Sequence, residues 1–333
     1  MRKRIANIIL LSGFIFLASG LFGQDIHFSQ FYNSPLNLNP GMIGVFNGDF
    51  RFVANQRTQW SSVTTPYSTF GISADANSLF GSPFGAGLSV YNDKAGDSEF
   101  GTLQIALGAS YRLQLDSTQS LIFSAQPAFT QRSINYTKLQ FDNQYNGFYY
   151  DENLGNGETF QNNGGTYFNL HGGLSWNKKI AQRKEVSAGF ALHNILKPEQ
   201  TFFNANIPLH QRITLHAGGL FAVSDKVDVL PAIQFQKQHN YKEIIFGGQG
   251  KYHLNNGNYK ALYGGIWYRN ADATYFSVGM DYADFHFGIS YDLNLSSLEV
   301  ASNHRGGFEF AIIYIISRYK PDIKRYKACP DYI

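Results

Sequence analysis

The chain has 333 residues, of which 15% are charged, 16% are aromatic and 33 are glycines. Arg2, Lys3 and Arg4 account for its formal net charge of +3, so the remainder is near neutral and gives no indication of nucleic-acid binding. Its single cysteine, Cys329, excludes an intramolecular disulfide.

The first 23 residues have the pattern of a cleavable signal peptide. Three basic residues precede an apolar stretch, Ile8–Leu17, and the small residues Ala18, Ser19 and Gly20 follow. We expect cleavage after Gly23 and export of the mature chain; a single N-terminal membrane anchor is the alternative. After Gly23 the sequence contains no apolar run long enough for a transmembrane helix.

Residues 24–48 come before any clear alternation of apolar and polar residues. Pro35 and Pro40 interrupt this segment. We interpret it as an N-terminal plug or a periplasmic extension, although part of it could form a first strand with a bulge. Phe31 and Tyr32 are candidates for contacts with periplasmic proteins.

The clearest strand pattern lies between Thr274 and Leu293. Apolar residues occupy every second position, small or polar residues occupy the others, and Ala283-Asp284 separates two such runs. A period of two predicts strands, and the two-residue break predicts a hairpin. An apolar face opposite a small or polar face, repeated along an exported chain, is typical of a transmembrane barrel.

The same alternation recurs between residues 49 and 316. It predicts an all-β, transmembrane antiparallel β-barrel of about fourteen strands with periplasmic N- and C-terminal extensions. The expected strands are 49–57, 68–76, 85–93, 102–114, 120–132, 165–176, 185–193, 211–223, 227–238, 241–254, 259–270, 274–282, 285–293 and 306–316.

The expected periplasmic connections are all short and most outer connections are long, as in bacterial barrels, although two outer connections, near Asn240 and Ala271, are also short. The longest outer connection, Ser133–Gly164, carries aromatic residues among Asn, Asp and Gly. We interpret it as a surface recognition loop, with a folded-in lid as the alternative. The candidate partner-binding residues are those of this loop and of the outer connection Asn294–Arg305, namely Tyr145, Phe148, Tyr149, Tyr150, Leu298 and Arg305.

Residues 317–333 follow the last strand as a basic tail. The topology places this tail in the periplasm, where Lys324 and Arg325 are candidates for contact with a partner or the cell wall. An ordinary solvated tail is the alternative.

The sequence contains no convincing catalytic, metal or phosphate-binding motif, so we expect no enzyme activity and no cofactor. His27 and Ser29 have a spacing that could pair a base with a nucleophile, but they precede the barrel. Asp281, His286, Ser290 and Asp292 share the expected lumen face. They form either an acid–base cluster or, as we favour, ordinary hydrogen bonds of a wet lumen. The tryptophans Trp60, Trp176 and Trp267 belong either to interfacial girdles or to ordinary packing.

Several separated motifs together resemble the PorP/SprF family over essentially the whole mature chain. They are His27–Tyr32, Pro35–Gly41, Asn55–Trp60 with Pro66-Tyr67, Gly265–Arg269, Ser290–Asn294, Ala301-Ser302 with Gly306–Phe310, and Cys329-Pro330. The Ser133–Gly164 loop has no matching family motif. The resemblance implies an outer-membrane barrel of the type IX secretion and gliding machinery of Bacteroidetes-like bacteria. It also implies partners: the C-terminal domains of secreted adhesins or other substrates, and periplasmic components of the machinery.

We therefore expect a non-enzymatic protein, surrounded by outer-membrane lipid, that docks or anchors a secreted adhesin-like partner at the cell surface. A passive porin or hydrophobic-solute channel is the alternative, and an open lumen would favour it. A third class, an outer-membrane hydrolase, requires a Ser/His or paired-carboxylate arrangement within hydrogen-bond reach.

Overall fold

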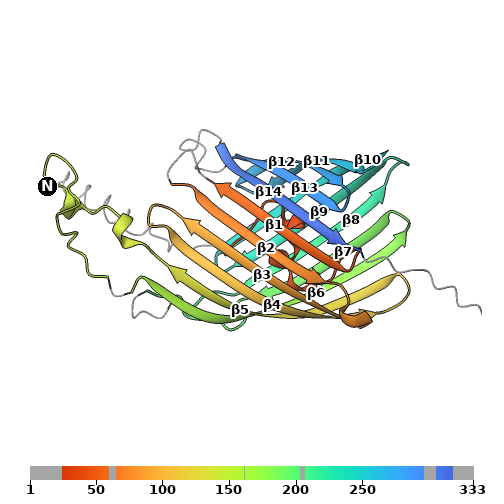
Figure 1. The fold of residues 1–333 in the computed structure, drawn as a ribbon, viewed down its shortest axis with the longest axis horizontal. Coiled ribbons are helices and arrows are strands. Elements are labelled where there is room, and N and C mark those ends of the chain that lie inside the picture. Colours follow the sequence, from red (N-terminus) through yellow and green to blue (C-terminus); the bar gives the residue numbers. More distant parts are fainter. Residues whose placement is uncertain (1–24, 60–64, 161, 203–206, 296–304, 318–333) are drawn as a thin grey trace, which may run out of the picture.

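The computed structural model describes residues 25–59, 65–160, 162–202, 207–295 and 305–317. These residues form one closed barrel of fourteen antiparallel strands, in which β1 pairs with β14. The strands are tilted relative to the barrel axis (Figure 1). The predicted antiparallel barrel of about fourteen strands is confirmed.

The strand bounds agree with the predicted ones to within two residues, except at the end of β6. The strands are β1 (Phe50–Gln59), β2 (Tyr67–Ala76), β3 (Phe84–Ala95), β4 (Phe100–Gln114), β5 (Gln119–Ser133), β6 (Gly164–Ala181), β7 (Lys184–His193), β8 (Arg212–Ala222), β9 (Val227–Gln238), β10 (Tyr241–Asn256), β11 (Tyr259–Arg269), β12 (Ala273–Tyr282), β13 (Phe285–Asn294) and β14 (Arg305–Ile316).

Alternation along each strand separates an apolar outer face from a polar or small-residue lumen face. On β12, Phe276 and Val278 are exposed on the outside, whereas Tyr275 and Ser277 are buried on the lumen side. The outer face carries exposed aliphatic and aromatic side chains on most strands, and a bilayer would cover them. Among the described residues, no helix is both long and apolar enough to cross a membrane.

The two ends of the barrel differ. At the short-turn end, connections such as 182–183, 257–258 and 283–284 join neighbouring strands directly. The predicted connection Asn177–Lys184 was too long, because β6 continues to Ala181 with Asn177 paired to Ser187. At the opposite, long-loop end, the connections include residues 134–163 and 194–211.

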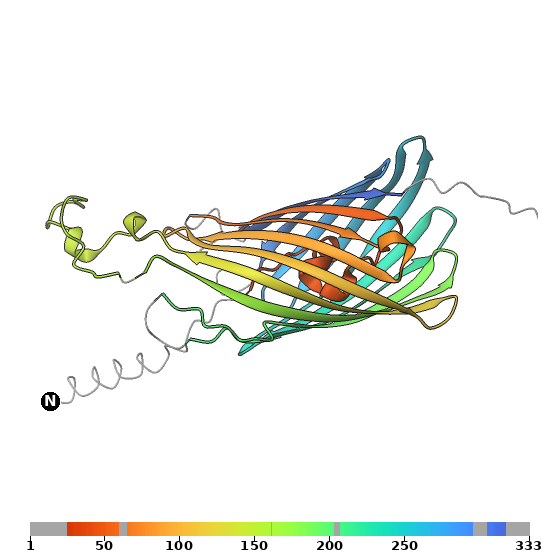
Figure 2. The same cartoon turned by 60° about the horizontal axis from the view of Figure 1, so that its bottom comes forward.

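The segment 25–48 lies inside the barrel. It contains three short helical elements, η1 (Phe31–Asn33), α2 (Pro35–Leu38) and η2 (Pro40–Met42), and then leads into β1. Figure 2 shows this segment in red, surrounded by the strands. Proline begins both α2 and η2, at a helix position where its missing N–H leaves no hydrogen bond unmade. We call residues 25–48 the plug.

Candidate functional site in the barrel lumen

The plug packs an aromatic cluster against the wall formed by β11 and β12. Phe31 and Tyr32 contact Trp267 with ring centroids 5.5 and 4.8 Å apart, and Trp267 lies 5.9 Å from the ring of Tyr275. Phe31 and Tyr32 were predicted as periplasmic contacts, but the structure places both inside the barrel, in the packing of the plug. The interfacial girdle considered for Trp267 is wrong, because this side chain is buried on the lumen face.

The first turn of the plug is anchored by a carboxylate from β14. The main-chain N–H groups of Ser29 and Gln30 donate to the two oxygens of Glu309 at 2.7 and 3.0 Å. The hydroxyl of Ser29 donates to Asp292 at 2.8 Å, and its carbonyl accepts from the Tyr275 hydroxyl at 2.6 Å. A buried turn without its own helical hydrogen bonds thus has its polar groups satisfied by the wall.

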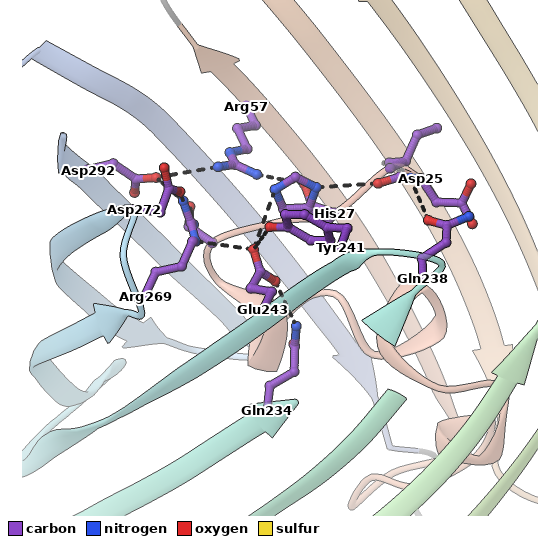
Figure 3. Close-up of polar contacts among 12 residues, drawn as sticks. Asp25, His27, Arg57, Gln234, Gln238, Tyr241, Glu243, Arg269, Asp272 and Asp292 are labelled. Carbon is purple, nitrogen blue, oxygen red and sulfur yellow. Dashed lines mark hydrogen bonds and ion pairs between the residues drawn. The ribbon is translucent and has the colours of Figure 1, made fainter. Parts of the chain in front are cut away.

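These anchors belong to a buried network of opposite charges. Arg269 contacts Asp292 at 3.2 Å and Glu243 at 3.5 Å, and Arg57 contacts Asp292 at 3.4 Å and Glu309 at 3.9 Å. Figure 3 shows Arg57, Arg269, Asp292 and Glu243 grouped around His27 at the start of the plug. All five charged side chains of this network are almost fully buried, so each arginine offsets the cost of removing carboxylates from water.

His27 lies next to this network at the tip of the plug. Its ring contacts Glu243 at 3.9 Å and the carbonyl of Asp25 at 3.3 Å (Figure 3). Burial lowers the pKa of His27 well below its ordinary value, and the positive charges of Arg57 and Arg269 act in the same direction. The ring is therefore neutral at neutral pH.

The second half of the plug packs closely on β6 and β7. Asn39 donates to the carbonyl of Leu174 at 3.0 Å, and its side-chain oxygen accepts from Gly41 N–H at 2.7 Å. Gly173 makes this approach possible: a Cβ there would lie 2.2 Å from both the Asn39 oxygen and the Gly41 nitrogen. The glycine in the barrel wall thus accommodates the plug backbone.

The end of the plug is held near the start of β1. Asp75 on β2 accepts the Gly44 N–H at 2.8 Å and forms an ion pair with Arg51 at 2.8 Å. Arg51 also donates to the carbonyl of Met42 at 3.0 Å, and Arg112 donates to the carbonyl of Gly44 at 2.6 Å. Contacts at the first turn, the middle and the end therefore fix the plug along its length.

A cavity of about 860 Å³ lies between the plug and the long-loop end; we call it the vestibule. Its floor includes the plug residues Asp25, His27 and Asn37. Its walls are formed by the long-loop ends of the strands, with side chains such as Asp93, Phe100, Arg132, Tyr167, His171, Arg212 and Asp272. The lumen thus has a closed middle and an open pocket above it.

The connection from β5 to β6 projects beyond the barrel rim in both views (Figures 1 and 2). It contains η4 (Tyr136–Lys138), η5 (Asp142–Gln144) and a bridge between Tyr145 and Tyr150. Asn146 shapes its tip by accepting the N–H groups of Phe148 and Tyr149 at 3.0 and 3.1 Å. The four predicted aromatics are exposed, Phe148 by 90%, and the alternative of a lid folded into the lumen is wrong.

The remaining candidate residues either lie outside the described residues or do not form one cluster. Leu298, Lys324 and Arg325 lie outside the described residues, and Arg305 is described only as the main chain that begins β14. His286 and Asp281 do form a contact of 2.7 Å. Asp292 instead pairs with Arg57 and Arg269, and the Ser290 hydroxyl has no hydrogen-bond partner among the described residues. The four residues therefore form no single acid–base cluster.

The predicted His27–Ser29 arrangement does not pair a base with a nucleophile. The Ser29 hydroxyl donates to Asp292 and accepts from Arg269 at 2.6 Å, while His27 faces Glu243. Within the described ranges, no cluster of three or more His, Cys, Asp or Glu side chains is placed to hold a metal ion.

Sequence reasoning missed the plug anchors Arg57, Arg269 and Glu309. A usable signal was present, because each lies at a lumen-facing position of a strand and inside a motif quoted for the family resemblance. A charged residue on the lumen face of a barrel needs a partner or water, and the buried plug provides contacts for all three.

The fold and the filled lumen define a membrane β-barrel closed by its own N-terminal segment. The model of the type IX secretion system membrane protein PorP/SprF family matches residues 21–314. The chain therefore belongs to the PorP/SprF family, as the sequence motifs predicted. A search of curated proteins finds no significant match.

Solved structures with a similar fold include three outer-membrane channels, all at a TM-score of 0.52. The CymD monoaromatic hydrocarbon channel is 12% identical, over 86% of this chain and 94% of that one. The toluene transporter TbuX of Ralstonia pickettii is 10% identical, over 85% and 92%. The toluene transporter TodX of Pseudomonas putida is 13% identical, over 85% and 93%. At these identities the likeness shows the fold alone.

Proposed function

We propose that this protein is a docking component of the type IX secretion machinery in the outer membrane. It holds a secreted adhesin-like protein at the cell surface through that protein's C-terminal domain. The long-loop end faces the outside, and the short-turn end, with the tail 317–333, faces the periplasmic components of the machinery. Residues 1–23 act as the signal peptide that exports the chain.

The observation that carries this proposal is the plug. The plug is hydrogen-bonded to the walls at both ends and packed on Trp267 and Gly173, so the middle of the lumen is filled. A passive pore needs a continuous wet path, whereas a docking protein needs a rigid scaffold with exposed contact groups. The filled lumen and the projecting loop favour docking.

The contact groups are the exposed aromatics of the β5–β6 connection. Tyr145, Phe148 and Tyr149 extend from a tip that Asn146 holds in shape. Large exposed aromatic side chains are enriched where proteins bind one another, because each buries much apolar area with few lost rotamers. This tip is the first surface that we assign to the secreted partner.

The docking function can be tested by gene deletion and complementation. We expect deletion to abolish surface display of at least one secreted protein, measured by labelling of intact cells, without changing its synthesis. The triple variant Tyr145→Ser, Phe148→Ser, Tyr149→Ser should fail to restore display, whereas the control Glu152→Ser, at an exposed polar position of the same connection, should restore it. Unchanged display in the deletion strain would refute the proposal.

The porin alternative makes a separate measurable claim. Purified full-length protein in a planar bilayer should show no steady single-channel conductance, because the plug fills the lumen. Stable channels in most insertions would instead support the passive porin. The hydrophobic-solute channel is tested by uptake of toluene into vesicles that contain the protein, which we expect to match that of empty vesicles.

A further inference from the structure

Two arginines that line the vestibule have no carboxylate partner within 4 Å in the described part of the chain. Arg212 on β8 donates to the main-chain carbonyls of Ile26 and Asn37 at 3.1 and 3.3 Å, and Arg132 on β5 donates to the side-chain oxygen of Gln200. Among the described residues, the buried Nε–H of each has no hydrogen-bond acceptor, as is also true of Arg57 and Arg269, so the missing carboxylate is what sets Arg132 and Arg212 apart. Arginines in such sites usually pair with carboxylates, often through two N–H donors.

A third unmet donor lies beside Arg212. The Nδ1 atom of His171 accepts the main-chain N–H of Asn194 at 3.2 Å, so in the neutral ring the proton is on Nε2. Only 5% of the His171 surface is exposed, and the buried Nε2–H has no acceptor among the described residues. Buried polar groups are normally satisfied, and His171 lines the vestibule, so a ligand or water in this cavity is the available acceptor.

The strand register brings these donors onto one wall. His193 on β7 pairs with Arg212 on β8, and the ring of His193 lies 5.2 Å from the ring of His171 on β6. His171 pairs with Gln126 on β5, and Arg132 lies six positions farther along that strand toward the long-loop end. At about 3.3 Å per residue, Arg132 lies about 20 Å along β5 from the position paired with His171.

Two acidic residues face this wall, but both are held by other groups. Asp25 accepts from the side-chain amide of Asn194 at 2.6 Å, and Asp93 accepts from the hydroxyl of Thr69 at 2.5 Å. Neither forms an ion pair with Arg132 or Arg212 in the described chain. Their negative charge disfavours a ligand with several charges, such as a phosphate group, more than a single carboxylate.

We propose that the vestibule binds the C-terminal end of an extended peptide, with its terminal carboxylate on Arg212 and His171. The chain then runs toward the rim, where Arg132 takes a second acceptor beside Phe100 and Tyr167. The separation of about 20 Å matches about six extended residues, and a volume of about 860 Å³ is within the range of ligand pockets. This inference rests on the proposed docking function and names the part of the partner that enters the barrel.

The test uses purified full-length protein in detergent and a library of hexapeptides with randomised side chains. The library is made twice, once with free C-terminal carboxylates and once with amides, and the retained peptides are measured by mass spectrometry after gel filtration. We expect the free-acid peptides to be retained about tenfold better, because only they pair with Arg212 and His171. Equal retention of acids and amides would overturn the proposal.

Variants separate the site from general effects on the barrel. His171→Phe should reduce retention of the acids to the level of the amides, and His171→Gln, which keeps an N–H donor, should preserve part of the preference. The control His286→Phe changes a lumen histidine at the short-turn end and should leave the preference intact. A loss of preference in His286→Phe but not in His171→Phe would contradict the assignment.

Two further probes distinguish the source of the anion. If octanoate displaces the peptides as well as an added free-acid hexapeptide does, the site binds fatty carboxylates and the peptide assignment is wrong. If inorganic phosphate displaces them better than acetate does, the site is a phosphate site and the proposal is also wrong. Failure of this inference leaves docking intact if deletion still abolishes surface display, so the two proposals fail separately.

Discussion

The two sides of the lumen solve the same electrostatic problem differently. On the side of β1, β10, β11, β13 and β14, Arg57 and Arg269 each face two buried carboxylates. On the side of β5 to β8, Arg132 and Arg212 donate to neutral oxygens and form no ion pair among the described residues. We call the first the matched side, because its arginines are paired with carboxylates, and the second the unmatched side. The matched side fixes the first turn of the plug, and the unmatched side is where we propose that a carboxylate binds.

Replacing an arginine on the matched side should lower the free energy of unfolding more than replacing one on the unmatched side. Arg269→Met leaves Asp292 and Glu243 buried with fewer counter-charges, so we expect a loss of about 3–5 kcal/mol in the free energy of unfolding. Urea unfolding of the refolded protein in detergent, followed by tryptophan fluorescence, measures this loss. If Arg269→Met lowered the free energy of unfolding no more than the equivalent change on the unmatched side, the proposed difference between the walls would be wrong.

That equivalent change is Arg212→Met. It removes hydrogen bonds to the carbonyls of Ile26 and Asn37 but breaks no ion pair among the described residues. We expect a loss of about 1–3 kcal/mol, together with faster amide hydrogen exchange in residues 25–40. The same urea unfolding and hydrogen exchange with mass spectrometry provide the measurements. An effect on the barrel strands equal to that on the plug would show that Arg212 holds the wall rather than the plug.

Gly173 allows the contribution of close packing to stability to be measured separately from the contribution of charge. Gly173→Ala places a methyl group 2.2 Å from Asn39 and Gly41, so the plug must move, at a cost of about 1–2 kcal/mol. Gly264→Ala is the matched control, because no atom lies within 4 Å of its added Cβ. Thermal unfolding should shift for Gly173→Ala and stay unchanged for Gly264→Ala. Equal shifts would mean that strand propensity, not contact with the plug, decides the result.

The sequence predicted the barrel well because strand alternation is a local property. Phe276 and Val278 point outward and Ser277 points inward, as the period of two requires. The two faces were harder to assign at Trp267, because both faces of Gly265–Arg269 carry large side chains. The seam between β1 and β14 followed from closure of the barrel.

The site was less predictable because its contacts join distant parts of the chain. Ser29 and Glu309 are 280 positions apart, and no local pattern pairs them. The inward position of Glu309 could be derived from alternation, but its partner could not. Likewise, the unmet donor of His171 depends on the main-chain N–H of Asn194, which only the folded loop after β7 brings within reach.

The smallest expected effect is a pH dependence on the matched side, centred on His27. Burial, followed by the charges of Arg57 and Arg269, lowers the pKa of His27, while Asp272 raises it and Glu243 lies 3.9 Å away. A base whose pKa is lowered on folding stabilises the plug fully above its ordinary pKa of about 6.5. This stability decreases as the pH falls below that value, because the unbound plug takes up a proton more readily.

We therefore expect the hydrogen-exchange protection of residues 26–33, corrected for intrinsic rates, to decrease between pH 7.5 and pH 5. His27→Asn, which cannot titrate in this range, should flatten the profile, whereas His286→Asn at the other end of the lumen should not. Protection that increased toward pH 5 would contradict the assignment of this pH dependence to His27.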